Sequence, residues 1–322
     1  MRLRINKTLL CLGIWIPVAA HAWGFAAHKQ INNAAVFTLP PALFKFYKAH
    51  ITEITEGAVK ADIRRYAFAD EGCKHYLDAD YYEKVIPLDS IPWYWKDAVA
   101  LFGKDTLTKH GTNPWNLQLM KWKLTKAFEA KDLKQIIRLS ADIGHYAADL
   151  HVPLHSTKNY NGQLTGQEGI HALWESRLFE LFTPDYNYLV GRATYVSSLT
   201  ELTWERFAES FGALDSVIGF EKLATEKYPD KYALKANERN TSKVYNEVFC
   251  QYYHQLLNGM VERRARASIH FIGSFWFTCW VDAGQPDLEN LKEEPKTESE
   301  ERERILIQMF FQKGNIIGRR ED

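Results

Sequence analysis

The chain has 322 residues, of which 46% are hydrophobic and 25% are charged, so it carries enough apolar side chains to bury a sizeable core. Lys and Arg together number 40, as do Asp and Glu, and the formal net charge is therefore zero. This composition excludes a disordered, highly charged chain, and the net charge selects no class of binding partner.

The first 22 residues have the pattern of a signal peptide. Basic residues precede an apolar run over residues 9–20, and Ala20 and Ala22 are the small residues that a signal peptidase reads. We therefore expect an exported protein, periplasmic or extracellular, whose mature chain begins at Trp23.

Two further features bear on the compartment and on membranes. The apolar stretch over residues 269–281 is shorter than the roughly 20 residues that span a bilayer, so we expect a buried helix there and no transmembrane segment after signal cleavage. Three cysteines follow the cleavage site, and an odd number is not a disulfide framework. Cys250 and Cys279 lie in aromatic-rich stretches where a free buried cysteine is common, and whether they pair stays open.

Apolar residues recur at three- and four-residue spacing along most of the chain, which predicts an all-α fold. The clearest stretches are residues 37–68, 116–150, 171–182, 198–220 and 242–277. Alternating strand patterns are nearly absent, and prolines and glycines mark loops between the helices. We expect a single multi-helix domain over residues 23–286. The charged segment 287–322 is predicted to be a solvated tail or a mobile helix.

Residues able to bind a metal gather between positions 145 and 175. Side chains four apart lie on one face of a helix, so His145 and Asp149 can present a nitrogen and a carboxylate to one point, as can His171 and Glu175. His155 follows just after the first pair. Imidazole and carboxylate groups in such clusters are typical zinc ligands. His151 lies six residues from His145, away from the ligand face, and we expect it to support the site or the fold without binding metal.

Two earlier stretches add candidate ligands. Cleavage after Ala22 would leave Trp23 with a free amine, and an amine with its neighbouring carbonyl can chelate zinc; His28 follows closely. Asp62 and His75 are thirteen residues apart in a segment rich in carboxylates. Taken alone, each of these residues is ordinary.

The order of these residues resembles a known superfamily, the zinc-dependent phospholipases C and single-strand-specific nucleases. The shared pattern is a Trp after a signal peptide, W-x4-H, D-x12-H, H-x3-D-x5-H and H-x3-E, and it spans Trp23 to Glu175. The resemblance implies an all-α fold with three zinc ions that hydrolyses phosphodiester bonds.

The resemblance also implies a role for each position. The first zinc would be held by Asp62, His75, His145 and Asp149. The second would share Asp149 and take the amine and carbonyl of Trp23 and the imidazole of His28. The third would be held by His155, His171 and Glu175. The catalytic residues would be Asp62, Asp149 and Arg65, which matches the position of a phosphate-contacting Arg in the nucleases.

The substrate stays open between two branches. The spacing of the N-terminal motif and Arg65 favour the nuclease branch, in which Tyr76 would stack on a base and Asp78 would accept from its amine. Glu175, where nucleases have Asp, favours a phospholipase C that cleaves lipid headgroups. A third hypothesis is a secreted zinc-binding protein without turnover. We infer no obligate protein partner. The preferred base or lipid headgroup and the oligomeric state do not follow from the sequence.

Overall fold

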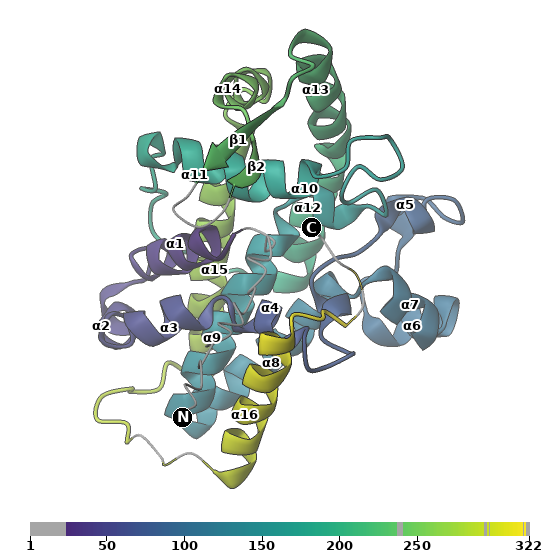
Figure 1. Ribbon diagram of the computed structural model, residues 1–322. Coiled ribbons are helices and arrows are strands. Elements are labelled where there is room, and N and C mark those ends of the chain that lie inside the picture. Colours follow the sequence, from purple (N-terminus) through teal and green to yellow (C-terminus); the bar gives the residue numbers. More distant parts are fainter. Residues whose placement is uncertain (1–23, 237–240, 293–294, 296, 318, 320–322) are drawn as a thin grey trace, which may run out of the picture.

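The computed structural model describes residues 24–236, 241–292, 295, 297–317 and 319. The predicted signal peptide and Trp23 lie outside these residues. The described part is mostly helical and forms a single domain, which confirms the predicted fold class (Figure 1). The boundary predicted at residue 286 stays a prediction.

The N-terminal half consists of helices joined by short turns. Its elements are α1 (Phe25–Val36), α2 (Pro41–Ala49), α3 (Ile51–Gly57), α4 (Lys60–Arg64), η1 (Gly72–Lys74), α5 (Ala79–Tyr82), η2 (Leu88–Ser90), α6 (Trp95–Phe102), α7 (Lys104–His110), α8 (Asn113–Ala130), α9 (Leu133–Leu150) and η3 (Pro153–Ser156). The stretch predicted as helical over 37–68 is thus three helices, and that over 116–150 is two, because Lys131 adopts a left-handed conformation between α8 and α9.

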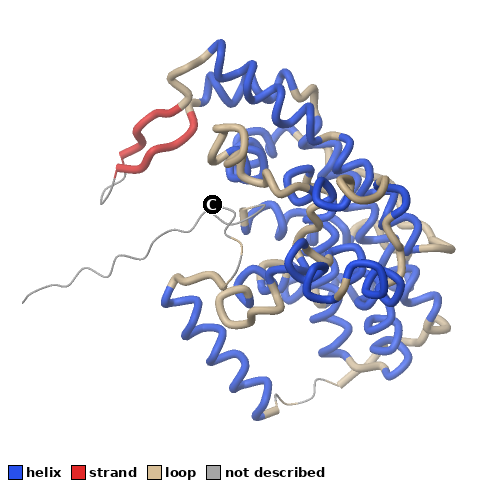
Figure 2. Tube along the Cα trace, turned by 90° about the vertical axis from the view of Figure 1, so that its right-hand side faces the viewer, coloured by secondary structure: helices blue, strands red, loops and turns tan. Residues whose placement is uncertain are grey.

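The C-terminal half contains the remaining helices and one hairpin. Its elements are α10 (Ile170–Ala172), η4 (Leu173–Arg177), α11 (Leu178–Phe182), η5 (Thr183–Asp185), α12 (Leu199–Gly212), α13 (Leu214–Lys227), β1 (Tyr232–Ala236), β2 (Thr241–Tyr245), α14 (Glu247–Leu256), α15 (Met260–Asp282) and α16 (Glu298–Lys313). Figure 2 shows the antiparallel hairpin projecting from the helical body. The prediction of helix from residue 242 is therefore wrong as far as residue 246.

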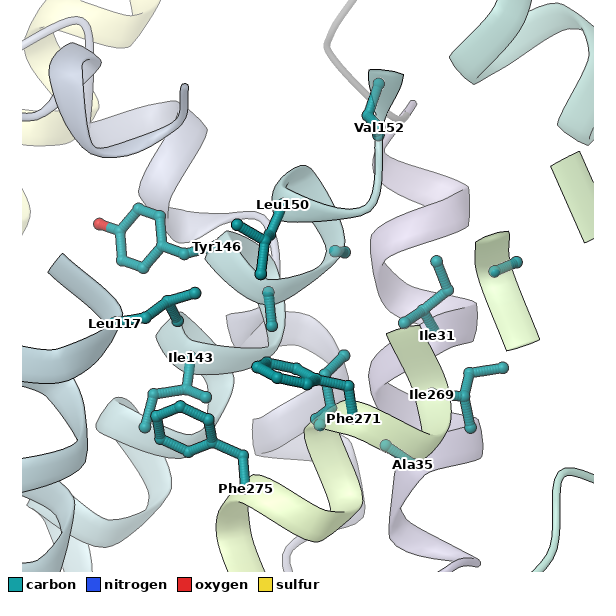
Figure 3. Close-up of a cluster of buried hydrophobic side chains, with 14 of the residues drawn as sticks. Ile31, Ala35, Leu117, Ile143, Tyr146, Leu150, Val152, Ile269, Phe271 and Phe275 are labelled. Atoms are coloured by element: carbon teal, nitrogen blue, oxygen red, sulfur yellow. The ribbon is translucent and has the colours of Figure 1, made fainter. Parts of the chain in front are cut away.

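The core is built around α9, which packs against α1, α3, α8 and α15. Ile31 of α1, Ile143 of α9 and Phe271 of α15 are among its fully or almost fully buried side chains (Figure 3). The stretch 269–281 lies within α15 and is largely buried, as predicted. Within the described ranges, no helix is both long and apolar enough to cross a membrane. Cys250 and Cys279 are buried free thiols.

Gly144 permits the close approach of α1 to α9. A Cβ atom at this position would lie 1.9 Å from Oδ1 of Asn32, whose amide donates to the carbonyl of Ala141 at 3.2 Å. This approach brings two predicted ligands together, since the rings of His28 on α1 and His145 on α9 stack at 4.0 Å.

We expect Gly144→Ala to lower the free energy of unfolding by about 1–3 kcal/mol, the usual cost of forcing an extra methyl group into a packed interior. Gly219→Ala is the matched control, because a Cβ atom on this helical glycine of α13 meets nothing within 4 Å. The control should be neutral or stabilising by up to about 1 kcal/mol. Urea unfolding of both variants measures the difference, and equal stabilities would contradict the packing argument.

Candidate metal centre

Two helices supply the residues at the centre of the site. Helix α9 begins at its cap Asp132, whose side chain accepts from the backbone N–H of Gln135, and it carries His145 and Asp149 on its buried face near its C-terminal end. Helix α1 brings His28 against them. All three side chains are fully buried, so they face one another away from bulk water.

Asp149 lies between the predicted ligands of two different zinc ions. Its Oδ1 atom is 3.4 Å from Nε2 of His28, whereas its Oδ2 atom is 2.9 Å from Nδ1 of His75 and 3.2 Å from Nε2 of His145. The two carboxylate oxygens therefore face different neighbours. This arrangement fits a carboxylate shared between two metal ions.

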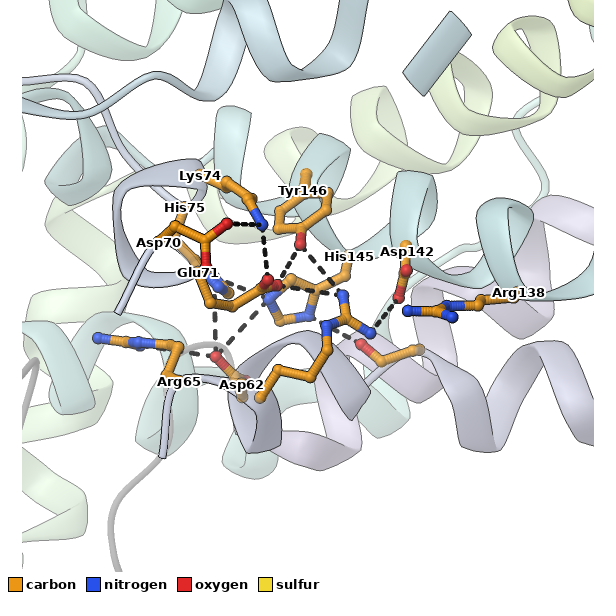
Figure 4. A network of polar contacts seen from close by, with 12 residues as sticks. Asp62, Arg65, Asp70, Glu71, Lys74, His75, Arg138, Asp142, His145 and Tyr146 are labelled. Carbon is orange, nitrogen blue, oxygen red and sulfur yellow. Dashed lines mark hydrogen bonds and ion pairs between the residues drawn. The ribbon is translucent and has the colours of Figure 1, made fainter. Parts of the chain in front are cut away.

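Asp62 and His75 complete the first cluster. Asp62 lies in the short helix α4, and its Oδ1 atom is 3.8 Å from Nδ1 of His75 and 3.6 Å from Nε2 of His145. Figure 4 shows these three side chains converging from separate segments. Residues 62, 75 and 145 thus meet although up to 83 positions separate them in the sequence.

The third cluster consists of His155, His171 and Glu175. Nε2 of His155 lies 3.0 Å from Oε1 of Glu175, and Nε2 of His171 lies 3.1 Å from its Oε2. Glu175 sits in η4, a π-helical turn, so the α-helix predicted over residues 171–182 is interrupted there. Single π-helical turns inside helices occur often at functional sites.

Ligand-type atoms gather in three groups, with the atoms of each group within 4.8 Å of one another. These groups are His28 with His145 and Asp149, Asp62 with His75 and His145, and His155 with His171 and Glu175. Every described residue predicted to bind zinc is in one of them. Trp23 lies outside the described residues, so its predicted role is not placed. The assignment of each residue to a particular ion stays a prediction.

Hydrogen bonds orient three of the histidines for metal binding. The Nδ1 atoms of His145, His155 and His171 lie 2.8, 2.8 and 3.0 Å from the backbone carbonyls of Ala58, His75 and Tyr160. An N–H donated to a carbonyl fixes the tautomer and leaves Nε2 with its lone pair for a metal.

Buried polar atoms without a hydrogen bond support the same conclusion. Both carboxylate oxygens of Asp62, Nε2 of His75 and Nε2 of His171 are buried and have no hydrogen-bond partner. Leaving such atoms without a partner in an apolar interior costs free energy, and the binding of an ion is a usual explanation for them. The donor set, imidazole with carboxylate, is the set that zinc prefers.

The candidate ligands shift one another's pKa values. Burial favours the neutral form of Asp149, but His145 and His155 outweigh it and hold the pKa of Asp149 well below its usual value. Burial and His145 lower the pKa of His28 to about 4. Burial lowers the pKa of His145, but the negative charges of Asp149 and Asp62 outweigh burial and raise this pKa to about 9. A metal bound to His145 would therefore displace a proton, which makes metal affinity depend on pH.

A buried network lies behind the metal ligands. Nη2 of Arg64 donates to Oε1 of Glu71 at 3.1 Å, and its Nη1 donates to Oδ1 of Asp142 at 3.0 Å. The hydroxyl of Tyr146 donates to Glu71, and its ring meets His75 edge to face (Figure 4). Arg64 was not among the site residues predicted from the sequence.

His151 takes no part in the three ligand groups. Its Nδ1 atom lies 2.7 Å from the carbonyl of Ala147, one turn earlier in the chain, and its own carbonyl accepts from Nε of Arg264 at 3.0 Å. Burial and Arg264 lower the pKa of His151 to about 3, so the ring is neutral. These contacts agree with the predicted supporting role.

Arg65, Tyr76 and Asp78 lie beside the clusters. Nη1 of Arg65 is 3.6 Å from Oδ1 of Asp62, and only 3% of the residue is exposed. Tyr76 and Asp78 follow His75 closely in the chain and line a pocket of about 440 Å³, and both contact Arg319 from the C-terminal segment. Their predicted roles in substrate binding stay predictions.

The helical fold and the three buried ligand groups define a helical protein with candidate sites for metal ions. Residues 27–258 match the family model described as zinc dependent phospholipase C, and the chain belongs to this family. It is therefore a zinc-dependent hydrolase, and the match does not separate lipid-cleaving from nucleic-acid-cleaving members. No curated protein matches the chain.

Proposed function

We propose that the protein is an exported phospholipase C that hydrolyses the phosphodiester bond of a phospholipid headgroup. The observation that carries the proposal is the family match over residues 27–258, together with three buried ligand groups in one centre. The description of the matched family supports a lipid substrate, whereas the motif spacing favoured nucleic acid. Zinc held by these three ligand groups would supply an activated water near neutral pH and positive charge opposite the phosphoryl oxygens.

The protein's own residues bring a phosphodiester to this centre. Arg65 is a buried cation within 3.6 Å of the Asp62 carboxylate, where it can pair with a phosphoryl oxygen. Asp62 and Asp149 are buried among the candidate ligands and would hold the metal. These three residues are the proposed catalytic set.

An aromatic run on the surface supports a lipid substrate. Trp93, Tyr94 and Trp95 are consecutive, and 40%, 61% and 37% of their surfaces are exposed. Trp and Tyr are the side chains that favour the boundary between lipid and water, because they combine an apolar ring with a polar group. The run therefore suits contact with a bilayer surface.

The competing substrate is single-stranded nucleic acid, and one observation favours it. The rings of Tyr76 and Tyr160 both face the planar guanidinium of Arg319, at 4.1 and 3.7 Å, while Asp78 accepts its N–H at 2.8 Å. A flat group with an N–H donor fits the same space, and a nucleobase with an exocyclic amine has this form.

Parallel assays of the zinc-loaded protein test the proposal. The substrates are phosphatidylcholine vesicles, a single-stranded oligonucleotide and bis-p-nitrophenyl phosphate, each with and without a chelator. We expect chelator-sensitive release of phosphocholine from vesicles. Cleavage of the oligonucleotide with intact lipid would replace the lipid proposal by the nuclease, and no hydrolysis of any diester would indicate a non-catalytic zinc protein.

For the lipid surface, we expect Tyr94→Ala to reduce kcat/KM on vesicles about 5-fold and to leave the soluble diester unaffected. The estimate corresponds to losing about 40 Å² of apolar contact with lipid, or about 1 kcal/mol. Tyr195→Ala, at a tyrosine that is 51% exposed outside the aromatic run, is the matched control. Equal effects of the two substitutions on vesicles would contradict a role for this surface.

A further inference from the structure

The C-terminal segment returns to the metal centre after α16. Gly314 ends the helix in a left-handed conformation, with φ of 71°, and the chain then runs beside α4 (Figure 1). The N–H of Ile317 donates to the carbonyl of Arg65 at 3.0 Å, and Nη2 of Arg65 donates to the carbonyl of Arg319 at 2.5 Å. The segment is thus bound to the residue proposed to contact the phosphate.

The guanidinium of Arg319 fills a slot made by four residues. It lies between the rings of Tyr76 and Tyr160, at 4.1 and 3.7 Å from their centroids. Its Nη1 donates to Oδ1 of Asp78 at 2.8 Å and its Nη2 to the carbonyl of Thr157 at 3.2 Å. Stacking and charge pairing together make this a specific guanidinium site.

Three of the four residues of this slot, Tyr76, Thr157 and Tyr160, are joined to a candidate zinc ligand. Tyr76 directly follows His75, and Thr157 lies two residues after His155. The carbonyl of Tyr160 accepts from Nδ1 of His171. The slot therefore adjoins the metal centre through its own residues, and a substrate group that contacts the same residues would compete with a group bound in it.

Helix α16, which leads to this segment, is attached at the surface of the helical body. Helix α16 has no buried residue among those described, and ion pairs such as Lys134 with Glu300 and Arg138 with Glu303 link it to α9. Partly exposed ion pairs of this kind contribute little stability. Release of the segment therefore requires little disruption of the core.

We propose that residues 315–317 together with Arg319 are a built-in competitive inhibitor, in which Arg319 occupies the slot of Tyr76, Tyr160 and Asp78 and must leave before a substrate enters. The proposal rests on the proposed function in one respect: the metal centre must hydrolyse a phosphodiester, which can be that of a phospholipid or of a nucleic acid. If the segment is docked most of the time, the apparent affinity for substrate falls by the fraction of open protein, while turnover after binding is unchanged.

The kinetic test compares Arg319→Ala with Arg302→Ala, the control. Arg302 is exposed on α16 and pairs within the helix with Glu298 at 3.0 Å. With the substrate identified by the parallel assays, we expect Arg319→Ala to lower KM about 10-fold with kcat and zinc content unchanged, and Arg302→Ala to match the wild type. Truncation after Lys313 should act as Arg319→Ala does. Unchanged or increased KM in both the truncated and the Arg319 variants would overturn the proposal.

A binding test is independent of catalysis. An amidated peptide of residues 313–319 is titrated calorimetrically into the zinc-loaded chain truncated after Lys313, alongside the same peptide carrying Arg319→Ala. We expect the first peptide to bind and to inhibit competitively, and the second to do neither. Equal binding of the two peptides, or none by either, would overturn the proposal. Suppose that only the peptide with Arg319 binds and that neither the wild type nor any variant hydrolyses a diester. This result would support the docking site and refute the proposed hydrolytic function.

Discussion

Asp149→Asn is expected to reduce both zinc content and kcat/KM, the latter by more than about 100-fold. The amide keeps the size of the side chain but removes the charge that faces His28 through one oxygen and His75 and His145 through the other. Supporting residues around a metal usually account for about 10- to 100-fold effects, and a shared ligand should exceed them. Zinc per chain after dialysis and kcat/KM on bis-p-nitrophenyl phosphate are the measurements.

The matched control for this experiment is His151→Ala. His151 lies two residues further along and is equally buried, but it contacts backbone groups and Arg264. It should keep its zinc and lose no more than about 10- to 100-fold in rate. Circular dichroism checks that both variants are folded. Zinc loss in the His151 variant, with Asp149→Asn unaffected, would reverse the assignment of the two residues.

The second large effect is expected from Arg64→Met, which should lower the free energy of unfolding by about 3–5 kcal/mol. Burial disfavours the charge of Arg64, but Asp142, Tyr146 and Glu71 outweigh burial and keep its pKa well above the usual value. Without the guanidinium, the carboxylates of Glu71 and Asp142 remain buried, with 4% and 8% of their side chains exposed, and lose their main partner.

Arg138→Met is the control for Arg64→Met. The Arg138 side chain is 45% exposed and pairs with Glu303 at 3.2 Å, so its loss should cost less than about 1 kcal/mol. Urea unfolding in the presence of a chelator measures both variants without a contribution from bound zinc. Equal, small losses would mean that Glu71 and Asp142 do not depend on Arg64.

Much of the metal centre could be predicted from sequence because its ligands obey local rules. A four-residue spacing on a helix determines the pairing of His145 with Asp149, and it holds in α9. The joining of these residues to His28 and Asp62 depends on tertiary packing, such as the contact of Gly144 with Asn32. No local pattern predicts such a contact, so these ligands were identified through the family resemblance.

Other features had no reliable local signal. The hairpin consists of two five-residue strands, β1 and β2. The second strand directly precedes a stretch with helical spacing, so it was predicted as part of that helix. The contact of Arg319 with Asp78 joins residues 241 positions apart, so the charged composition of the C-terminal segment gave no sign of it. Tyr160 was not predicted as a site residue. The one sign of its role in the sequence was its position in the loop between the candidate ligands His155 and His171.

The π-helical turn at η4 has a consequence for the rotational register of the helix that follows. A turn with one more residue than an α-helical turn acts as a single-residue insertion, and each residue of an α-helix corresponds to about 100° of rotation. Glu175 can therefore face the histidines while Leu178 and Phe179, three and four residues later, still pack into the core. The extra residue allows the metal-facing and core-facing side chains of one continuous helix to be oriented independently.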